Sequence, residues 1–196
     1  MSKFIPRLYA RSWATRYVSN PIARVLIALK IHPNIITLVG FGVAAYSAYL
    51  LSDGRFVVGG VVMLLGSAMD MLDGAVARMA GKDSLFGAFF DSVMDRLGEA
   101  VVFFGLAAFY VQGGSAGGAY LAFAALTMSM MVSYLRARAE GLAVAGDVGI
   151  MGRPERVVVL GVALLGGYPI YGMAIIALLA SFTVVQRGAS VWRATR

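Results

Sequence analysis

The 196-residue chain contains no cysteine and a single histidine, and only 14% of its residues are charged. Without cysteine it forms neither a disulfide framework nor a thiolate metal site. With 60% hydrophobic residues and a mean hydropathy of +0.79, it is too apolar for an ordinary soluble domain. Internal repeats, low-complexity tracts and linkers are also missing from the sequence. These features predict one integral membrane domain over residues 1–196, of the all-α class.

The apolar residues fall into long runs that predict six transmembrane helices in a bundle over residues 32–187. A helix of roughly 20 residues crosses the ~30 Å hydrocarbon core of a bilayer. The predicted spans are His32–Ser52, Phe56–Ala80, Ser84–Gln112, Tyr120–Glu140, Pro154–Gly166 and Ile170–Gln186. The turn signal Gly166-Gly167-Tyr168-Pro169 divides a short apolar stretch between the last two. A single broken span there is therefore an alternative, which gives five spans.

The N-terminal segment, residues 1–31, is too charged to span a membrane. Leu8, Trp13 and Tyr17 alternate with arginines, which predicts an amphipathic helix lying in the membrane interface. A lid over a cytoplasmic pocket is the alternative role for this segment. Because the segment lacks a continuous apolar h-region and a small-residue cleavage site, we expect no signal peptide.

Lysine and arginine are distributed unevenly over the predicted topology. With six spans, one side carries both termini and every basic residue except Arg55. The positive-inside rule makes this side cytoplasmic. We therefore expect a multi-pass protein of the cell membrane with both termini and the active site facing the cytoplasm. The net charge of +7 then reflects topology and attraction to anionic lipids, and we expect no nucleic-acid partner.

Four aspartates lie within sequence that is apolar enough to cross a membrane: Asp70, Asp73, Asp91 and Asp95. A carboxylate at the centre of a spanning helix costs about 2.5–3.5 kcal/mol on insertion scales, so its presence indicates a function. The spacings of three and four residues place each pair on one face of its helix. The short connection at residues 81–84, with Asp83 or Ser84 as the helix N-cap, makes the two helices antiparallel neighbours. We therefore expect the two pairs to converge.

Converging carboxylates repel one another unless cations lie between them. Oxygen ligands without cysteine or a nearby histidine favour a hard cation, Mg2+ or Mn2+. Four carboxylates suffice for two metal ions roughly 3.5–4 Å apart, the arrangement that clamps phosphoryl oxygens during in-line displacement. Gly74, Ala77 and Gly87 leave room for a flat group to approach, although close helix packing is an alternative role for small residues. Arg78 is suited to pair with an aspartate or to reach a phosphate.

The aspartates belong to a longer pattern, Asp70-x-x-Asp73-Gly74-x-x-Ala77-Arg78, eight residues, then Gly87-x-x-x-Asp91-x-x-x-Asp95. This pattern matches the signature of the CDP-alcohol phosphotransferases at each defined position, and the chain resembles this family over essentially its whole length. The resemblance implies six spans, a homodimer and two Mg2+ or Mn2+ ions. It also implies an enzyme in which an alcohol hydroxyl displaces CMP from a CDP-linked lipid or alcohol.

The resemblance also implies roles for individual residues. The metal ligands are Asp70, Asp73, Asp91 and Asp95, and Asp95 is also the general base. The preceding string Pro33-Asn34-Ile35-Ile36-Thr37 is similar to the family's entry to the first span. The implied CDP-lipid site, which holds the cytidine and diphosphate, is lined by Asn34, Thr37, Asp73, Gly74, Ala77, Arg78 and Gly87.

A second cluster of charge follows the signature. Ser133 to Glu140 ends the fourth predicted span, Arg153-Pro154-Glu155-Arg156 opens the fifth, and Gln186-Arg187 closes the sixth. Anchoring at the membrane interface is one interpretation, but as a set these arginines suit a dianionic phosphate, which a guanidinium binds through two hydrogen bonds. The strings are similar to those of the phosphatidylinositol-phosphate and archaetidylinositol-phosphate synthases of the family. Gly152 departs from that pattern, in which an acidic residue is expected.

This second resemblance implies inositol 1-phosphate as the acceptor and CDP-diacylglycerol or CDP-archaeol as the lipid donor. Ser133, Arg156 and Arg187 hold the acceptor phosphate in this interpretation, assisted by Arg136, Arg138 and Arg153. Glycerol 3-phosphate and serine are alternative acceptors within the family. A divalent-cation transporter lined by the aspartates and a non-catalytic membrane scaffold are the alternatives from other classes. Against a transporter, no second acidic set lies toward the outer face.

Overall fold

The structure, a computed structural model, describes residues 32–80 and 84–196. In helix α4 the backbone is described, but the side chains of residues 70–75, 77, 78 and 80 are not. The amphipathic helix expected at residues 1–31 and the connection at 81–83 lie outside the described residues. All regular secondary structure in the described residues is α-helical, which confirms the expected all-α class.

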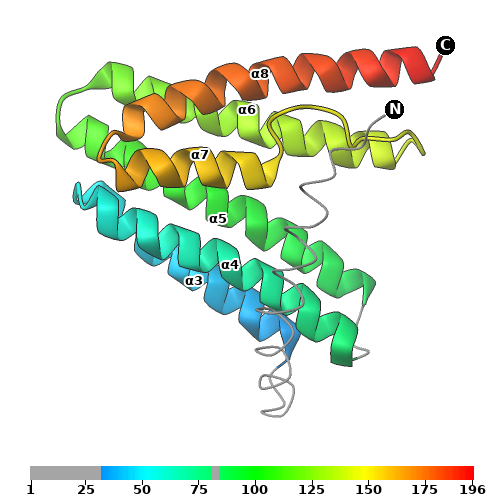
Figure 1. Cartoon of the computed structure of the whole chain (residues 1–196), viewed down its shortest axis with the longest axis horizontal. Helices are drawn as coiled ribbons and strands as arrows, with labels where there is room; N and C mark the ends of the chain where they lie inside the picture. The colour runs from blue at the N-terminus through cyan, green and yellow to red at the C-terminus, as the bar shows by residue number, and fades with distance from the viewer. Residues whose placement is uncertain (1–31, 81–83) are drawn as a thin grey trace. The chain divides into compact units, whose positions relative to one another are not determined.

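Six helices are present within the described residues (Figure 1). They are α3 (Pro33–Ser52), α4 (Phe56–Ala80), α5 (Leu85–Gln112), α6 (Ala116–Glu140), α7 (Arg153–Leu165) and α8 (Pro169–Ala194). The predicted bounds agree within one residue at most ends. Helix α6 begins before the predicted Tyr120, because Ser115 caps it by accepting a hydrogen bond from the Gly118 amide at 3.3 Å. Helix α8 continues past the predicted Gln186. The prediction ended too early because the apolar pattern stops at the first charged residues, whereas a helix tolerates charged residues and continues through them.

The turn predicted at residues 166–169 separates two helices. Gly167 has a φ of +77°, a conformation that glycine adopts readily, and Pro169 begins α8. Residues 154–186 therefore form two helices in place of a single broken one. However, α7 has 13 residues, which at 1.5 Å per residue reach about 20 Å, less than the ~30 Å of the hydrocarbon core. The number of complete spans stays a prediction.

Three of the described helices, α3, α6 and α8, are long and apolar enough to cross a membrane. In α4 the apolar part covers Phe56–Met69 and the aspartates follow it, while α5 carries its charges in its first half. Large apolar side chains point outward, among them Leu85, Phe104 and Leu178 with exposed fractions of 94%, 74% and 71%. Such surfaces are stable against lipid and not against water. The chain is therefore a multi-pass membrane protein.

The chain forms two compact units whose borders fall inside helices α3, α4 and α5. One unit extends up to Val43 and includes Leu65–Gly98, and the other comprises Ala44–Leu64 and Glu99–Arg196. The single domain expected over residues 1–196 stays a prediction.

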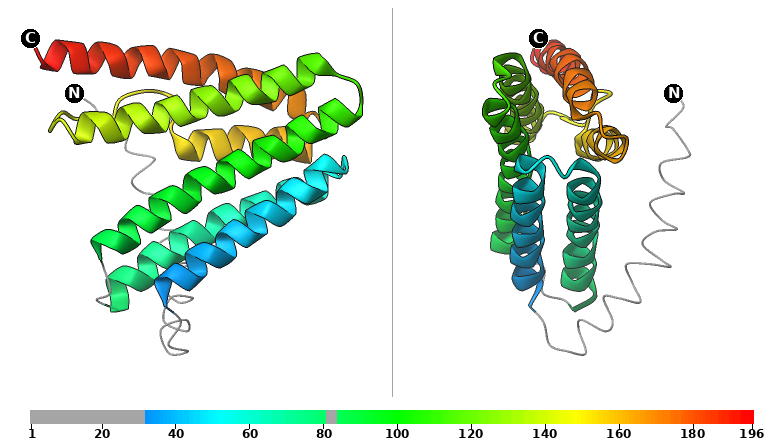
Figure 2. Two further views of the ribbon diagram at one scale, coloured as in Figure 1. Left: turned by 180° about the vertical axis from the view of Figure 1, so that it is seen from behind. Right: turned by 90° about the vertical axis from the view of Figure 1, so that its left-hand side faces the viewer.

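In the second unit, helix α8 packs against both α6 and α7 (Figure 2). The buried core includes Leu51, Phe103, Leu106, Leu164 and Ile176. Small residues let the helix backbones approach closely, as they commonly do between membrane helices. At Gly105, any side chain would overlap the carbonyl group of Ala48. A buried hydrogen bond of 2.8 Å from Ser47 Oγ to the Gly59 carbonyl also joins α3 to α4.

In the first unit, the N-terminus of α5 is capped as the sequence predicts. The Ser84 hydroxyl accepts a hydrogen bond of 2.9 Å from the amide of Gly87, the third residue of the helix. The same unit brings α3 and α4 together at Gly66, where a methyl group would lie 3.2 Å from Val43 Cγ1. The first residues of α5 and the middle of α4, the two helices that carry the signature, are therefore held by defined contacts.

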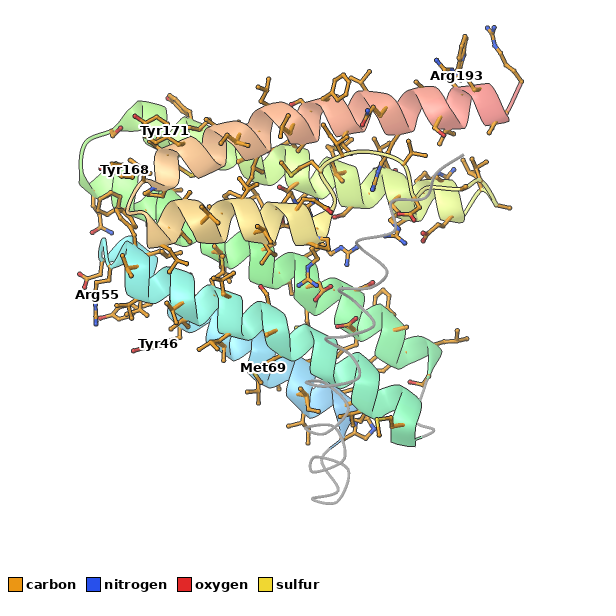
Figure 3. The ribbon with its side chains drawn as sticks, viewed as in Figure 1. Tyr46, Arg55, Met69, Tyr168, Tyr171 and Arg193 are labelled. Atoms are coloured by element: carbon orange, nitrogen blue, oxygen red, sulfur yellow. The ribbon has the colours of Figure 1, made fainter. Side chains whose placement is uncertain are left out.

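Aromatic and basic side chains of the second unit mark its two ends (Figure 3). Tyr168 and Tyr171 lie at the same end as Arg55, with ring centroids 6.1 Å apart, and Arg193 lies near the far end of α8. Tyrosines concentrate at membrane interfaces. This arrangement agrees with the predicted topology, in which Arg55 and Arg193 face opposite sides, and the orientation itself stays a prediction.

Replacing Gly105 with alanine tests the close approach of α5 to α3. We expect Gly105→Ala to destabilise the protein by about 1–3 kcal/mol, because backbone atoms of Ala48 must move to admit the methyl group. Gly42→Ala, also within a helix but with open space at the substituted position, is the control and should not lower the melting temperature. Thermal unfolding of the detergent-solubilised variants measures the difference. Equal melting temperatures for the two variants would contradict this packing.

Candidate functional site

Asp91 and Asp95 lie one turn apart on α5, and both are largely buried. Asp91 Oδ1 is inaccessible and has no hydrogen-bond partner among the described residues. The Asp95 side chain is 12% exposed and lies 3.7 Å from Arg96 Nη1. A buried carboxylate oxygen without a donor costs at least ~1–3 kcal/mol. A bound cation is one way to compensate this oxygen.

The remaining two signature aspartates belong to the part of α4 whose side chains are not described. The backbone of Asp70 and Asp73 is helical, but their carboxylates are not described. The same holds for the side chains of Ala77 and Arg78 and for the surroundings of Gly74. Within the described residues no group of three potential ligands comes together. The donor chemistry that is described fits a hard divalent cation, because Asp91 presents an orphaned buried oxygen and Asp95 a second carboxylate on the same face.

Two residues expected at the nucleotide site are neighbours in the first unit. A methyl group on Gly87 would lie 3.6 Å from Asn34 Oδ1 and 3.0 Å from Ser84 Oγ. Thr37, one turn after Asn34, is 6% exposed and donates a hydrogen bond of 3.3 Å to the Pro33 carbonyl. The absence of a side chain at Gly87 therefore allows Ser84 and the amide of Asn34 to lie close to the α5 backbone.

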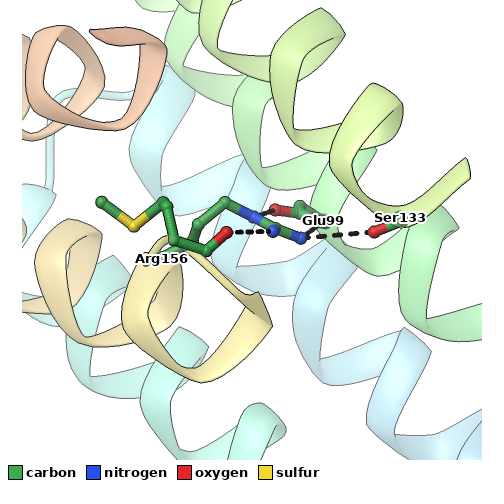
Figure 4. Close-up of polar contacts among 4 residues, drawn as sticks. Glu99, Ser133 and Arg156 are labelled. Carbon is green, nitrogen blue, oxygen red and sulfur yellow. Dashed lines mark hydrogen bonds and ion pairs between the residues drawn. The ribbon is translucent and has the colours of Figure 1, made fainter. Parts of the chain in front are cut away.

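Arg156, which the sequence places among the phosphate-binding residues, forms a buried bidentate ion pair with Glu99 (Figure 4). Its Nε lies 2.7 Å from Glu99 Oε1, and its Nη2 lies 3.0 Å from Oε2. Nη2 also approaches Ser133 Oγ at 3.5 Å, and Nη1 donates to the Met151 carbonyl at 3.4 Å. The side chain of Arg156 is 2% exposed and that of Glu99 14%. All three guanidinium nitrogens are engaged.

Arg187 is equally buried, but its partners are neutral. Its Nε donates to the Val148 carbonyl at 2.8 Å, and its Nη1 donates to the Val132 carbonyl. Among the described residues no carboxylate forms an ion pair with it, so its positive charge is not cancelled in the way that Glu99 cancels that of Arg156. Arg136 and Arg156 are close enough to Arg187 for like-charge repulsion. Asp147 and Glu140 are close enough to attract the Arg187 guanidinium, so basic and acidic side chains are mixed around it.

The other arginines of the expected acceptor site are less buried. Arg136 forms an exposed pair with Glu140 one turn later, at 2.9 Å between Nε and Oε1. Arg138 is exposed near the end of α6, and Arg153, the first residue of α7, is partly buried. Two pairs of expected acceptor-site residues therefore lie near each other. Ser133 contacts Arg156, and Arg136 lies near Arg187.

Glu99 is not a member of the signature and was not predicted as a site residue from the sequence. A signal was present, because Asp91, Asp95 and Glu99 recur every fourth residue and share a face of α5. An acidic residue in an apolar run also requires a partner. Its partner Arg156 is 57 residues away in the sequence, and no local pattern identifies it.

Helices with apolar exteriors and a set of buried charged side chains define a membrane-embedded protein. The buried charged side chains are the groups suited to its chemistry. The chain matches the CDP-alcohol phosphatidyltransferase family over residues 30–187 and belongs to that family. It is therefore a transferase of phospholipid biosynthesis, as the signature predicts.

Individual relatives carry more specific names. The chain is 36% identical over 164 residues to the archaetidylinositol phosphate synthase of Methanothermobacter thermautotrophicus, covering 81% of this chain and 82% of that protein. It is 34% identical over 202 residues to the phosphatidylinositol phosphate synthase of Cutibacterium acnes, covering 95% and 97% of the two chains.

Solved structures of a further relative have the same fold. The crystal structure of Mycobacterium tuberculosis phosphatidylinositol phosphate synthase with CDP-DAG bound matches with a TM-score of 0.83 and 30% identity, over 89% of this chain and 94% of that one. The structure of the same enzyme in complex with manganese and citrate matches with a TM-score of 0.81 and 31% identity, over 89% of each chain.

The two kinds of arginine pair differ in their expected contribution to stability. We expect Arg156→Ala to destabilise the protein by about 3–5 kcal/mol, because it leaves Glu99 buried without its partner. Arg136→Ala breaks the exposed pair with Glu140 and should cost at most about 1 kcal/mol. Melting temperatures of the purified variants in one detergent test this difference. Similar losses in the two variants would contradict the burial of the Glu99–Arg156 pair.

Proposed function

We propose that the enzyme transfers a phosphatidyl-type group from a CDP-linked lipid to inositol 1-phosphate and releases CMP. The observation that carries this proposal is Arg187, a buried guanidinium without a carboxylate partner among the described residues and with Arg136 and Arg156 close by. A buried guanidinium that donates only to backbone carbonyls favours an acceptor with a phosphate group over serine, which has none. The names of the relatives, one archaetidyl and one phosphatidyl, agree on inositol phosphate and leave the hydrocarbon chains of the lipid open.

The CDP-lipid site in this proposal is the signature itself. Asn34, Thr37, Gly74, Ala77, Arg78 and Gly87 line the nucleotide and diphosphate, and Asp73 contributes to both this site and the metal site. The proposed ligands of two divalent ions, Mg2+ or Mn2+, are Asp70, Asp73, Asp91 and Asp95. When bound, such ions neutralise the diphosphate and the charge that develops on its oxygens during displacement. The orphaned oxygen of Asp91 and the Mn2+ bound by the mycobacterial relative support this assignment.

Asp95 is the proposed general base. Its carboxylate accepts the proton of an inositol hydroxyl as the hydroxyl oxygen attacks the phosphorus that carries the lipid. The new oxygen–phosphorus bond joins inositol phosphate to the lipid, the bond to the CMP oxygen breaks, and CMP leaves. The partial burial of Asp95 supports this role, because removing water strengthens its hydrogen bond to the substrate.

The acceptor phosphate is proposed to lie among Ser133, Arg136, Arg138, Arg153, Arg156 and Arg187. The exposed members are suited to attract the anion and the buried members to orient it. Because the charge of Arg156 is compensated by Glu99 and that of Arg136 by Glu140, the net attraction comes mainly from Arg138 and Arg187. The homodimer, the cytoplasmic orientation and the interfacial helix at residues 1–31 stay predictions.

A product analysis tests the proposed acceptor. Membranes containing the protein are incubated with CDP-diacylglycerol and, separately, with inositol 1-phosphate, glycerol 3-phosphate, inositol or serine, and the lipid product is identified by mass spectrometry. We expect phosphatidylinositol phosphate and stoichiometric CMP with inositol 1-phosphate. Product with glycerol 3-phosphate in place of inositol 1-phosphate would move the assignment to that acceptor. Divalent-cation flux into proteoliposomes without CMP release would contradict an enzymatic function.

Substitution of the proposed base separates chemistry from binding. We expect Asp95→Asn to lower kcat by at least about 10²-fold, the range of general-base contributions, while CDP-lipid still binds. Radiolabelled CDP-diacylglycerol binding and CMP release are measured on the same preparation. A variant that loses binding together with turnover would show that Asp95 serves the lipid site and is not the base.

A further inference from the structure

The ion pair between Glu99 and Arg156 fixes the position of a guanidinium in three dimensions. Two parallel hydrogen bonds, of 2.7 and 3.0 Å, determine both the distance and the plane of the group. The Arg156 side chain is 2% exposed and that of Glu99 14%, so water has little access to either bond. A bidentate pair of this kind holds Arg156 in one orientation, whereas a single hydrogen bond would not fix the orientation of the guanidinium.

In this orientation Arg156 reaches two elements that surround the expected acceptor site. Nη2 approaches Ser133 on α6, and Nη1 binds the Met151 carbonyl in the segment before α7. The same segment is held by α8, where the Thr183 hydroxyl accepts a hydrogen bond of 3.1 Å from the Met151 amide. Glu99 on α5 is thus connected through Arg156 to α6 and to the α6–α7 connection.

From this network we infer that Glu99 is a positioning residue for the acceptor: it orients Arg156, which in turn sets the geometry of Ser133 and of the backbone at Met151 around the acceptor phosphate. The inference rests on the proposed function. Glu99 itself has no contact with either substrate in this account, and its effect passes through Arg156. Charge compensation of Arg156 without any role in positioning is the alternative, and the two roles make different predictions for Glu99→Asp.

Aspartate retains the negative charge of Glu99 but is one methylene shorter, so it loses the bidentate geometry. We expect Glu99→Asp to raise the KM for inositol 1-phosphate about tenfold, the effect of one lost charge-assisted hydrogen bond, with little change in the KM for CDP-diacylglycerol. If Glu99 merely compensates charge, the acceptor KM of Glu99→Asp stays at the wild-type value. The matched control is Asp53→Glu, which changes the length of an exposed acid on the turn between α3 and α4 by one methylene and should leave both KM values unchanged.

A double-mutant cycle tests whether Glu99 acts through Arg156. Arg156→Lys retains a positive charge but not the planar fork, and we expect it to raise the acceptor KM as Glu99→Asp does. In the Arg156→Lys background, Glu99→Asp should raise the acceptor KM by no more than about twofold, because the contact it alters is already lost. Additive effects of the two substitutions, or equal changes in the KM values of both substrates, would overturn the inference.

Direct binding of inositol 1-phosphate to the purified wild-type protein distinguishes this inference from the proposed function. If the wild type neither binds nor uses inositol 1-phosphate but uses glycerol 3-phosphate, the proposed acceptor is wrong, and the cycle is measured with glycerol 3-phosphate. If the wild type uses inositol 1-phosphate and Glu99→Asp binds it with unchanged affinity, the positioning role fails while the proposed function stands. If no phosphorylated acceptor binds, both fail.

Discussion

The constraint on which this structure depends is that a charge inside an apolar protein must be compensated by a defined partner. The second unit satisfies this constraint twice with arginine. Arg156 is paired bidentately with Glu99, and Arg187 donates to the carbonyls of Val132 and Val148. These contacts join helices α5, α6, α7 and α8 to one another. Most of the remaining packing in this unit is between apolar side chains. Losing one partner therefore disturbs several helices together.

The charges that the described protein does not compensate are the informative ones for function. Asp91 has a buried oxygen without a donor among the described residues, and Arg187 has a positive charge that only neutral groups contact there. The proposed metal ions are assigned to the first group and the proposed acceptor phosphate to the second. Proteins commonly depart from local satisfaction at functional sites. The proposed metal and acceptor-phosphate sites rest partly on this basis, whereas the proposed CDP-lipid site rests on the signature.

Much of the fold was predictable from the sequence because hydropathy and turn chemistry determine where membrane helices begin and end. The bounds of α4 and the break at Gly166 to Pro169 follow from apolar runs, glycine and proline. The signature aspartates stand out in the sequence because carboxylates in apolar helices are costly, and their role as a site stays a prediction. The far end of α8 was not, because a hydropathy pattern ends at the first charges while the helix continues to Ala194.

The partners of the arginines were not predictable, because they depend on tertiary structure. Arg156 and Arg187 lie near helix ends, where a basic residue is commonly an interfacial anchor, and their near-complete burial depends on how α6, α7 and α8 pack. Glu99 follows the signature by one helical turn and was identified only when its carboxylate was found beside Arg156. Sequence patterns identify which charges need partners, whereas the choice of partner is made by packing.

The central claim is that the signature carboxylates hold divalent cations, and Mn2+ binding measured by electron paramagnetic resonance tests it most directly. The full chain, purified in detergent, is titrated with Mn2+ in the presence of CDP-diacylglycerol, beside Asp91→Asn and beside Asp53→Asn, an exposed aspartate on the α3–α4 turn. The account predicts about two bound ions per chain in the wild type and in Asp53→Asn, and weaker binding in Asp91→Asn. Equal Mn2+ binding by all three proteins, or none by the wild type, would contradict it.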